Sequence, residues 1–171
     1  SSDSQGVGVR FGIPYTEFDK IFYGLKYEAT DINLGDSPPG RFQTYCQPYL
    51  PDCATDSFII SIGWSRDTRD NGLAPNEGSL QKANFDYATP LGEVQYARAT
   101  YRIQWYKPLT KKITYATSVN TGYGISLGGS EFPIFRNFYA GGIGSLRGFA
   151  NRSIGEKDET DGSSIGGTKK I

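Results

Sequence analysis

Ala97-Arg98-Ala99-Thr100-Tyr101-Arg102-Ile103-Gln104-Trp105 alternates strictly between apolar and polar side chains. Successive side chains of a β-strand point to opposite faces of a sheet, so a strand with this sequence has one apolar and one polar face. On a helix, at about 100° per residue, the same apolar residues would spread around the whole circumference. The segment is therefore predicted to be a strand.

The same period of two recurs along most of the chain. β-branched and aromatic residues dominate these segments, which favours strands and leaves almost no helix to expect. Ile59 is an apolar exception on a polar side of the pattern. Counting 97–105, seven segments alternate, the last of them incompletely; the other six are 7–13, 21–29, 58–65, 82–87, 113–123 and 165–171. The predicted fold class is all-β.

The lengths of the connections give a second signal. Short turns are predicted at 14–19, 67–78 and 107–111, whereas 34–56 and 128–167 are long; the short link at 90–92 is an exception on the long side. Short turns on one rim and long loops on the other are typical of an antiparallel up-and-down transmembrane β-barrel. Both ends of the chain lie in mid-pattern, and a spanning barrel must close. We therefore expect a partial barrel of about seven strands, a fragment of one barrel domain.

The polar face is expected to line a hydrated lumen and the apolar face to meet lipid, with Tyr and Trp at the interfaces. The alternative is a soluble β-sandwich whose apolar face is the core. The charged residues predicted to share the luminal face are Arg10, Lys26, Glu28, Lys82, Asp86, Arg98 and Arg102.

Composition argues against several classes of function. The 171 residues carry 18 basic and 18 acidic side chains, so no overall basic field favours nucleic acid as a partner. There is no His, which removes the commonest catalytic base and metal ligand. Cys46 and Cys53 are predicted to form a disulfide in an exposed loop, since two thiols are too few for a structural zinc site. We expect no enzyme activity, no metal and no cofactor.

Two motifs carry a family resemblance. The first is Asp67-Thr68-Arg69-Asp70-Asn71-Gly72-Leu73-Ala74-Pro75-Asn76-Glu77-Gly78, which follows Trp64. The second is Phe135-Arg136-Asn137-Phe138-Tyr139-Ala140-Gly141-Gly142, followed by Leu146-Arg147-Gly148-Phe149. They are similar to the D-x-R-D…P-x-x-G turn and the F-Y-x-G-G…R-G-F/Y loop of the BamA family of outer-membrane β-barrel assembly factors. The chain resembles the middle of that family's sixteen-stranded barrel over essentially its whole length.

The resemblance implies roles for particular residues. It makes 34–56 an extracellular loop and 128–167 a long extracellular loop that folds into the lumen, with the family's POTRA domains absent from this chain. Arg147 would pair with acidic residues beyond Ile171, Gly148 would let the backbone bend, and Phe149 would wedge against the wall. The functional loop residues are thus Phe138, Tyr139, Gly141, Gly142, Leu146, Arg147, Gly148 and Phe149. The residues of the turn, Asp67, Arg69, Asp70, Pro75 and Gly78, are expected to be structural.

By the same resemblance, the parent protein would be the central barrel subunit that folds and inserts β-barrel precursors into the bacterial outer membrane without nucleotide. Its partners would be unfolded outer-membrane protein precursors, accessory assembly lipoproteins and outer-membrane lipid, and not nucleic acid. Two alternatives remain open: a secretion transporter of the two-partner type from the same superfamily, and a diffusion porin, against which the R-G-F loop argues.

Overall fold

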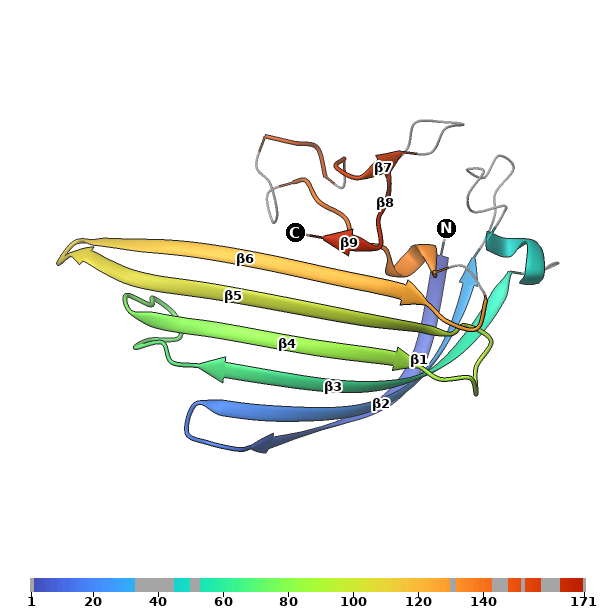
Figure 1. The fold of residues 1–171 in the computed structure, drawn as a ribbon, viewed down its shortest axis with the longest axis horizontal. Helices are drawn as coiled ribbons and strands as arrows, with labels where there is room; N and C mark the ends of the chain where they lie inside the picture. The colour runs from blue at the N-terminus through green and yellow to red at the C-terminus, as the bar shows by residue number, and fades with distance from the viewer. Residues whose placement is uncertain are drawn as a thin grey trace.

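The computed structural model describes residues 2–32, 45–49, 53–129, 132–142, 148–151, 153–157 and 164–170. One antiparallel sheet of seven strands dominates it, in the order β1-β2-β3-β4-β5-β6-β9, with β1 and β9 as open edges (Figure 1). The strands are β1 Ser2–Pro14, β2 Asp19–Ile32, β3 Ala54–Asp67, β4 Gly78–Ala88, β5 Tyr96–Thr110, β6 Ile113–Ser126 and β9 Lys169–Lys170. The predicted all-β, up-and-down arrangement of about seven strands is confirmed.

Smaller elements lie on one side of this sheet. A two-stranded sheet pairs β7 (Glu156–Lys157) with β8 (Ser164–Gly166), and the 3-10 helices η1 and η2 cover Gln47–Tyr49 and Ile134–Arg136. Figure 1 shows η2, β7, β8 and β9 above the long strands. The β7–β8 pairing was not predicted, because its strands are too short to show a period. Within the described residues, no helix is long and apolar enough to cross a bilayer.

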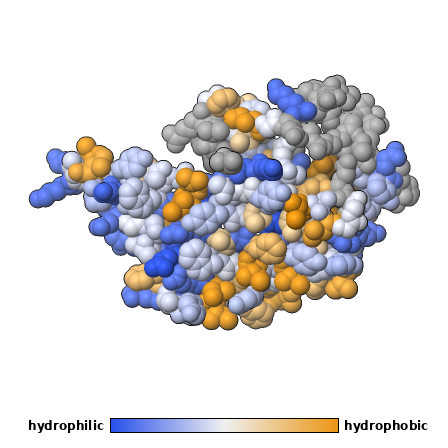
Figure 2. Space-filling view, viewed as in Figure 1, coloured by the Kyte–Doolittle hydropathy of each residue, from blue (hydrophilic) through white to orange (hydrophobic). Residues whose placement is uncertain are grey.

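The register keeps apolar residues together across the strands. Val9 lies opposite Leu25, Leu25 opposite Ile60, and Ile60 opposite Tyr87. These side chains stay open to the surroundings: Val9 is 56% exposed and Leu25 is 51% exposed. In Figure 2 hydrophobic residues gather along the lower margin, on the side away from β7–β9. No second sheet among the described residues covers this apolar face, as a β-sandwich would require.

The polar face carries the molecule's buried core at one end of the strands. One cluster, near the end of β2, contains Ile32, Cys46, Cys53 and Ile134. A second cluster explains Ile59, which is only 4% exposed because it packs on the polar face with Ala88, Val94 and Tyr96. The core therefore lies between the sheet and the long connections.

One predicted turn was wrong. The connection expected at 107–111 is reduced to residues 111–112, because β5 continues to Thr110 with an irregularity between Pro108 and Thr110. Pairing of β4 with β5 ends at Gly78 and Tyr106, so the β5–β6 hairpin extends beyond β4 (Figure 1). Pro108 is tolerated there because its missing N–H deprives no third strand of a hydrogen bond.

Candidate functional site

The base of the 128–167 connection is paired with itself and seated beside β6. Phe138 and Gly167 exchange two backbone hydrogen bonds, with N···O distances of 2.8 and 3.0 Å. Just beyond Gly167, β9 pairs with Gly122 and Tyr123 of β6, and the Gly124 amide donates to the Thr168 carbonyl at 2.7 Å. The two ends of the connection thus converge on one strand of the wall. We call residues 132–140 and 164–168 the loop stem.

Two glycines of β6 make room for aromatic rings of the loop stem. A Cβ at Gly122 would overlap the ring of Phe138, and a Cβ at Gly124 would overlap the ring of Phe132. Phe138 is 9% exposed, and the guanidinium of Arg98 lies 4.5 Å from its ring centre. Glycine inside a strand often marks such a close approach. Gly122 and Gly124 were not predicted site residues, although two glycines on the polar side of an alternating segment are a signal for one.

Arg136 connects the loop stem to a distant strand. Its Nη2 atom lies 2.7 Å from Oε2 of Glu28 on β2, and the same carboxylate oxygen accepts a hydrogen bond from Lys26. Glu28 is only 5% exposed. The alternation placed Glu28 on the luminal face. It could not identify Arg136 as its partner, because 108 residues separate the two.

The F-Y-x-G-G motif turns the chain after the loop stem. Gly141 and Gly142 have φ of 106° and 93°, the left-handed region that favours glycine. The Gly142 amide donates to the Phe149 carbonyl at 3.1 Å, which brings the two motifs together. Tyr139 lies between the two bridged residues Phe138 and Ala140.

The tip motif is only partly described. Leu146 and Arg147 lie outside the described residues, so their predicted roles stay predictions. Gly148 has a φ of 91°, in keeping with a bend. Phe149 is 57% exposed, so the expected wedge against the wall is not formed with the described residues.

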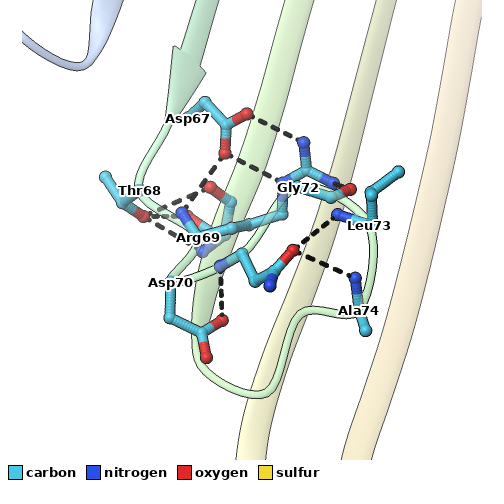
Figure 3. A network of polar contacts seen from close by, with 9 residues as sticks. Asp67, Thr68, Arg69, Asp70, Gly72, Leu73 and Ala74 are labelled. Carbon is cyan, nitrogen blue, oxygen red and sulfur yellow. Dashed lines mark hydrogen bonds and ion pairs between the residues drawn. The ribbon is translucent and has the colours of Figure 1, made fainter.

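The 67–78 turn is held by its own side chains (Figure 3). Arg69 donates to both carboxylate oxygens of Asp67, from Nε at 2.9 Å and from Nη2 at 2.8 Å. Asp70 Oδ1 accepts from the backbone amides of Asn71, Asn76 and Glu77 at 2.9 to 3.1 Å. These backbone hydrogen bonds, from Glu77 and Asn76 above all, lower the pKa of the exposed Asp70 carboxyl.

Glycine closes the turn. Gly78 has a φ of 98°, and a Cβ there would overlap the Thr68 carbonyl. Thr68 in turn accepts a hydrogen bond at Oγ1 from the Ser79 amide at 3.0 Å. Pro75 lies between Ala74 and Asn76 and is partly buried. The turn is a fixed structure that ties β3 to β4.

Cys46 and Cys53 are joined by a disulfide with a Cα–Cα distance of 5.2 Å. Both residues are buried, and their cluster includes Ile134 of η2. Tyr45 stacks edge-on to Phe135, with 6.2 Å between ring centres. The described residues Tyr45, Cys46 and Cys53 of the 34–56 connection therefore pack on the loop stem. Among the described residues, no three His, Cys, Asp or Glu side chains are grouped so that they could hold a metal ion.

A family model described as the Omp85 superfamily domain matches residues 1–171. The chain belongs to the Omp85 superfamily. Within it, the chain is 33% identical to the outer membrane protein assembly factor BamA of Neisseria meningitidis serogroup B, over 96% of this chain and 22% of that protein. It is 23% identical to BamA of Nitratidesulfovibrio vulgaris, over 99% of this chain and 21% of that protein.

Two further similarities broaden this result. A sorting and assembly machinery component 50 homolog of Mus musculus is 33% identical over 56% of this chain and 20% of its own length. The crystal structure of BamA from Haemophilus ducreyi lacking POTRA domains 1–3 superposes with a TM-score of 0.86 at 27% identity, covering 98% of this chain and 35% of that one. The chain thus spans about a fifth of the curated relatives and forms a segment of a BamA-like barrel.

Proposed function

We propose that the parent protein is the central barrel subunit of an outer-membrane protein assembly machinery in a bacterial outer membrane. It receives unfolded barrel precursors, pairs their strands at an open seam and releases them into the membrane without nucleotide. Accessory assembly lipoproteins and outer-membrane lipid are its further partners. The segment described above forms wall opposite the seam, with 34–56 and 128–167 on the extracellular side.

The observation that carries this proposal is a loop stem seated on the polar face of a sheet whose apolar face is uncovered. An uncovered apolar face suits a wall in lipid. A loop stem seated on the polar face does not suit a diffusion porin, whose channel is open to water. The BamA relatives, which are named as assembly factors, support assembly as the activity.

The physical reason for such an activity lies in strand edges. An unpaired edge in hydrocarbon leaves backbone N–H and C=O groups unsatisfied, at a cost of several kcal/mol each. A barrel with a seam supplies a partner edge, so no covalent chemistry is needed.

Replacing Arg147→Ala in the full-length protein tests the proposal. The measurement is the abundance of many unrelated barrels in isolated outer membranes, together with the folded amount of the variant itself. A general fall in barrels with the variant still folded supports assembly, whereas loss of one secreted client would instead indicate a two-partner secretion transporter. Lys112→Ala, in the exposed β5–β6 turn, is the control for loss of a positive charge.

A further inference from the structure

Arg136 lies in η2, two residues before Phe138, with which the F-Y-x-G-G sequence begins. Its Nη2 atom is 2.7 Å from Oε2 of Glu28. In the sheet, β3, β4 and β5 separate the strand of Glu28 from β6, beside which the loop stem is seated. The ion pair therefore crosses the polar face and connects β2 to the loop stem directly, without passing through the hydrogen-bonded neighbours β3, β4 and β5.

The surroundings of this pair favour one arrangement. The Arg136 side chain is 23% exposed and the Glu28 side chain 7%. The guanidinium of Arg136 lies 6.0 Å from the ring centre of Tyr96 and 5.8 Å from that of Phe135. Its Nε atom is buried and has no acceptor in the described part of the chain, and its Nη2 atom donates to Glu28 Oε2. Attraction between a guanidinium and aromatic rings at this distance favours keeping the Arg136 charge in this position.

Removing one member of a buried ion pair is costly because the other charge stays behind in a poorly solvated place. Here the cost is unequal. Without Arg136, Glu28 keeps Lys26, whose side chain is 48% exposed. Without Glu28, both cations lose their carboxylate. Glu28 substitutions should therefore be more damaging than Arg136 substitutions.

We infer that Arg136 and Glu28 form a latch that holds the loop stem against β2, and that barrel assembly depends on the loop stem being held there. This inference rests on the proposed function. Arg136 and Glu28 are positioning residues, and their effect is transmitted through the loop stem. The latch acts at the stem, apart from any contact that the tip makes.

The test compares Glu28→Arg, Arg136→Glu and the double exchange in the full-length protein. Three quantities are measured: the folded amount of each variant, cleavage of the 128–167 loop by protease added to intact cells, and outer-membrane barrels per folded copy. Each single variant should raise the cleavage rate about fivefold or more and lower barrels per folded copy. The double exchange should improve both readouts over either single change, although Lys26 will limit the recovery.

Glu28→Gln removes the carboxylate charge of the latch without adding a positive charge. Glu17→Gln, in the exposed β1–β2 turn, is its matched control. The latch is overturned if the double exchange is no better than the worse single variant, or if the loop is released while barrels per folded copy stay unchanged. Depleting the whole protein separates the two ideas. If barrels survive depletion, the assembly function fails; if they fall on depletion yet not in variants with a released loop, the latch alone fails.

Discussion

The 67–78 turn and the loop stem are held in opposite ways. In the turn, Asp70 and Gly78 act on backbone within the same short segment. The loop stem depends on residues far away in sequence, Glu28 for Arg136 and Gly122 for Phe138. A turn of the first kind can form before the rest of the wall, whereas the stem has its geometry only once β2 and β6 are in place.

Substitution of Gly78→Ala should produce the largest effect and break the turn. The positive φ and the overlap with the Thr68 carbonyl together should lower the free energy of unfolding by about 3 kcal/mol. Denaturant unfolding of the full-length protein in detergent measures it. Gly72→Ala is the control in the same turn, because nothing lies within 4 Å of its Cβ position. Equal stability of the two variants would contradict a requirement for glycine at 78.

Gly122→Ala should come next, and it acts on the loop stem. The added methyl overlaps the Phe138 ring, and overpacking of this kind costs about 2 kcal/mol. We expect faster proteolysis of the loop with little change in the turn. Gly24→Ala, in β2 on the same polar face of the sheet, is the control. A Cβ at Gly24 would lie 3.5 Å from its nearest neighbour, which is an ordinary contact distance. If Phe138→Ala fails to relieve the Gly122→Ala defect, the ring contact is not the cause.

Loss of the Cys46–Cys53 bridge should have a similar or smaller effect, about 2 kcal/mol, since the ring it closes is short. We expect the packing of Tyr45 on Phe135 to loosen. Because Phe135 belongs to the loop stem, the stem should loosen with it. Intact mass after alkylation should rise by two alkyl groups only when reduction precedes it. Free thiols without reduction would disprove the bridge.

Asp70→Asn should have the smallest effect and should be confined to the turn. The pKa of Asp70 is lowered in the folded state, so its stabilisation is present above the unfolded pKa and disappears as the pH falls through the folded value. The difference in stability between wild type and Asp70→Asn should therefore be constant near neutral pH and shrink below about pH 4. A difference that grows in acid would refute this account of the turn.

The sequence sufficed for the sheet because a period of two is a local property. Apolar residues such as Val9, Leu25 and Ile60 share one face across strands, as the alternation predicted. The start of β1 was underestimated, because residues 2–6 are rich in Ser and Gly and show no alternation between apolar and polar side chains. The exception at Ile59 was visible in the sequence, but its cause, burial under Val94 and Tyr96, is tertiary.

The loop stem shows where such prediction stops. The motif located Phe138 and the glycines after it, yet nothing local names Glu28 as the partner of Arg136. An ion pair across 108 residues depends on where the sheet bends, which no single segment encodes. The ring contacts at Gly122 and Gly124 could have been predicted, since glycine on the polar face of a strand signals the close approach of another group.

The unequal connections have a kinetic consequence. β1 with β2 and β5 with β6 close over residues 15–18 and 111–112, so these hairpins nucleate early at small loop-closure cost. Pairing of β6 with β9 must close over residues 127–168, the most distant ladder in the sheet, and should be the last to zip. The loop stem consequently settles late, on a polar face that the earlier hairpins have already assembled.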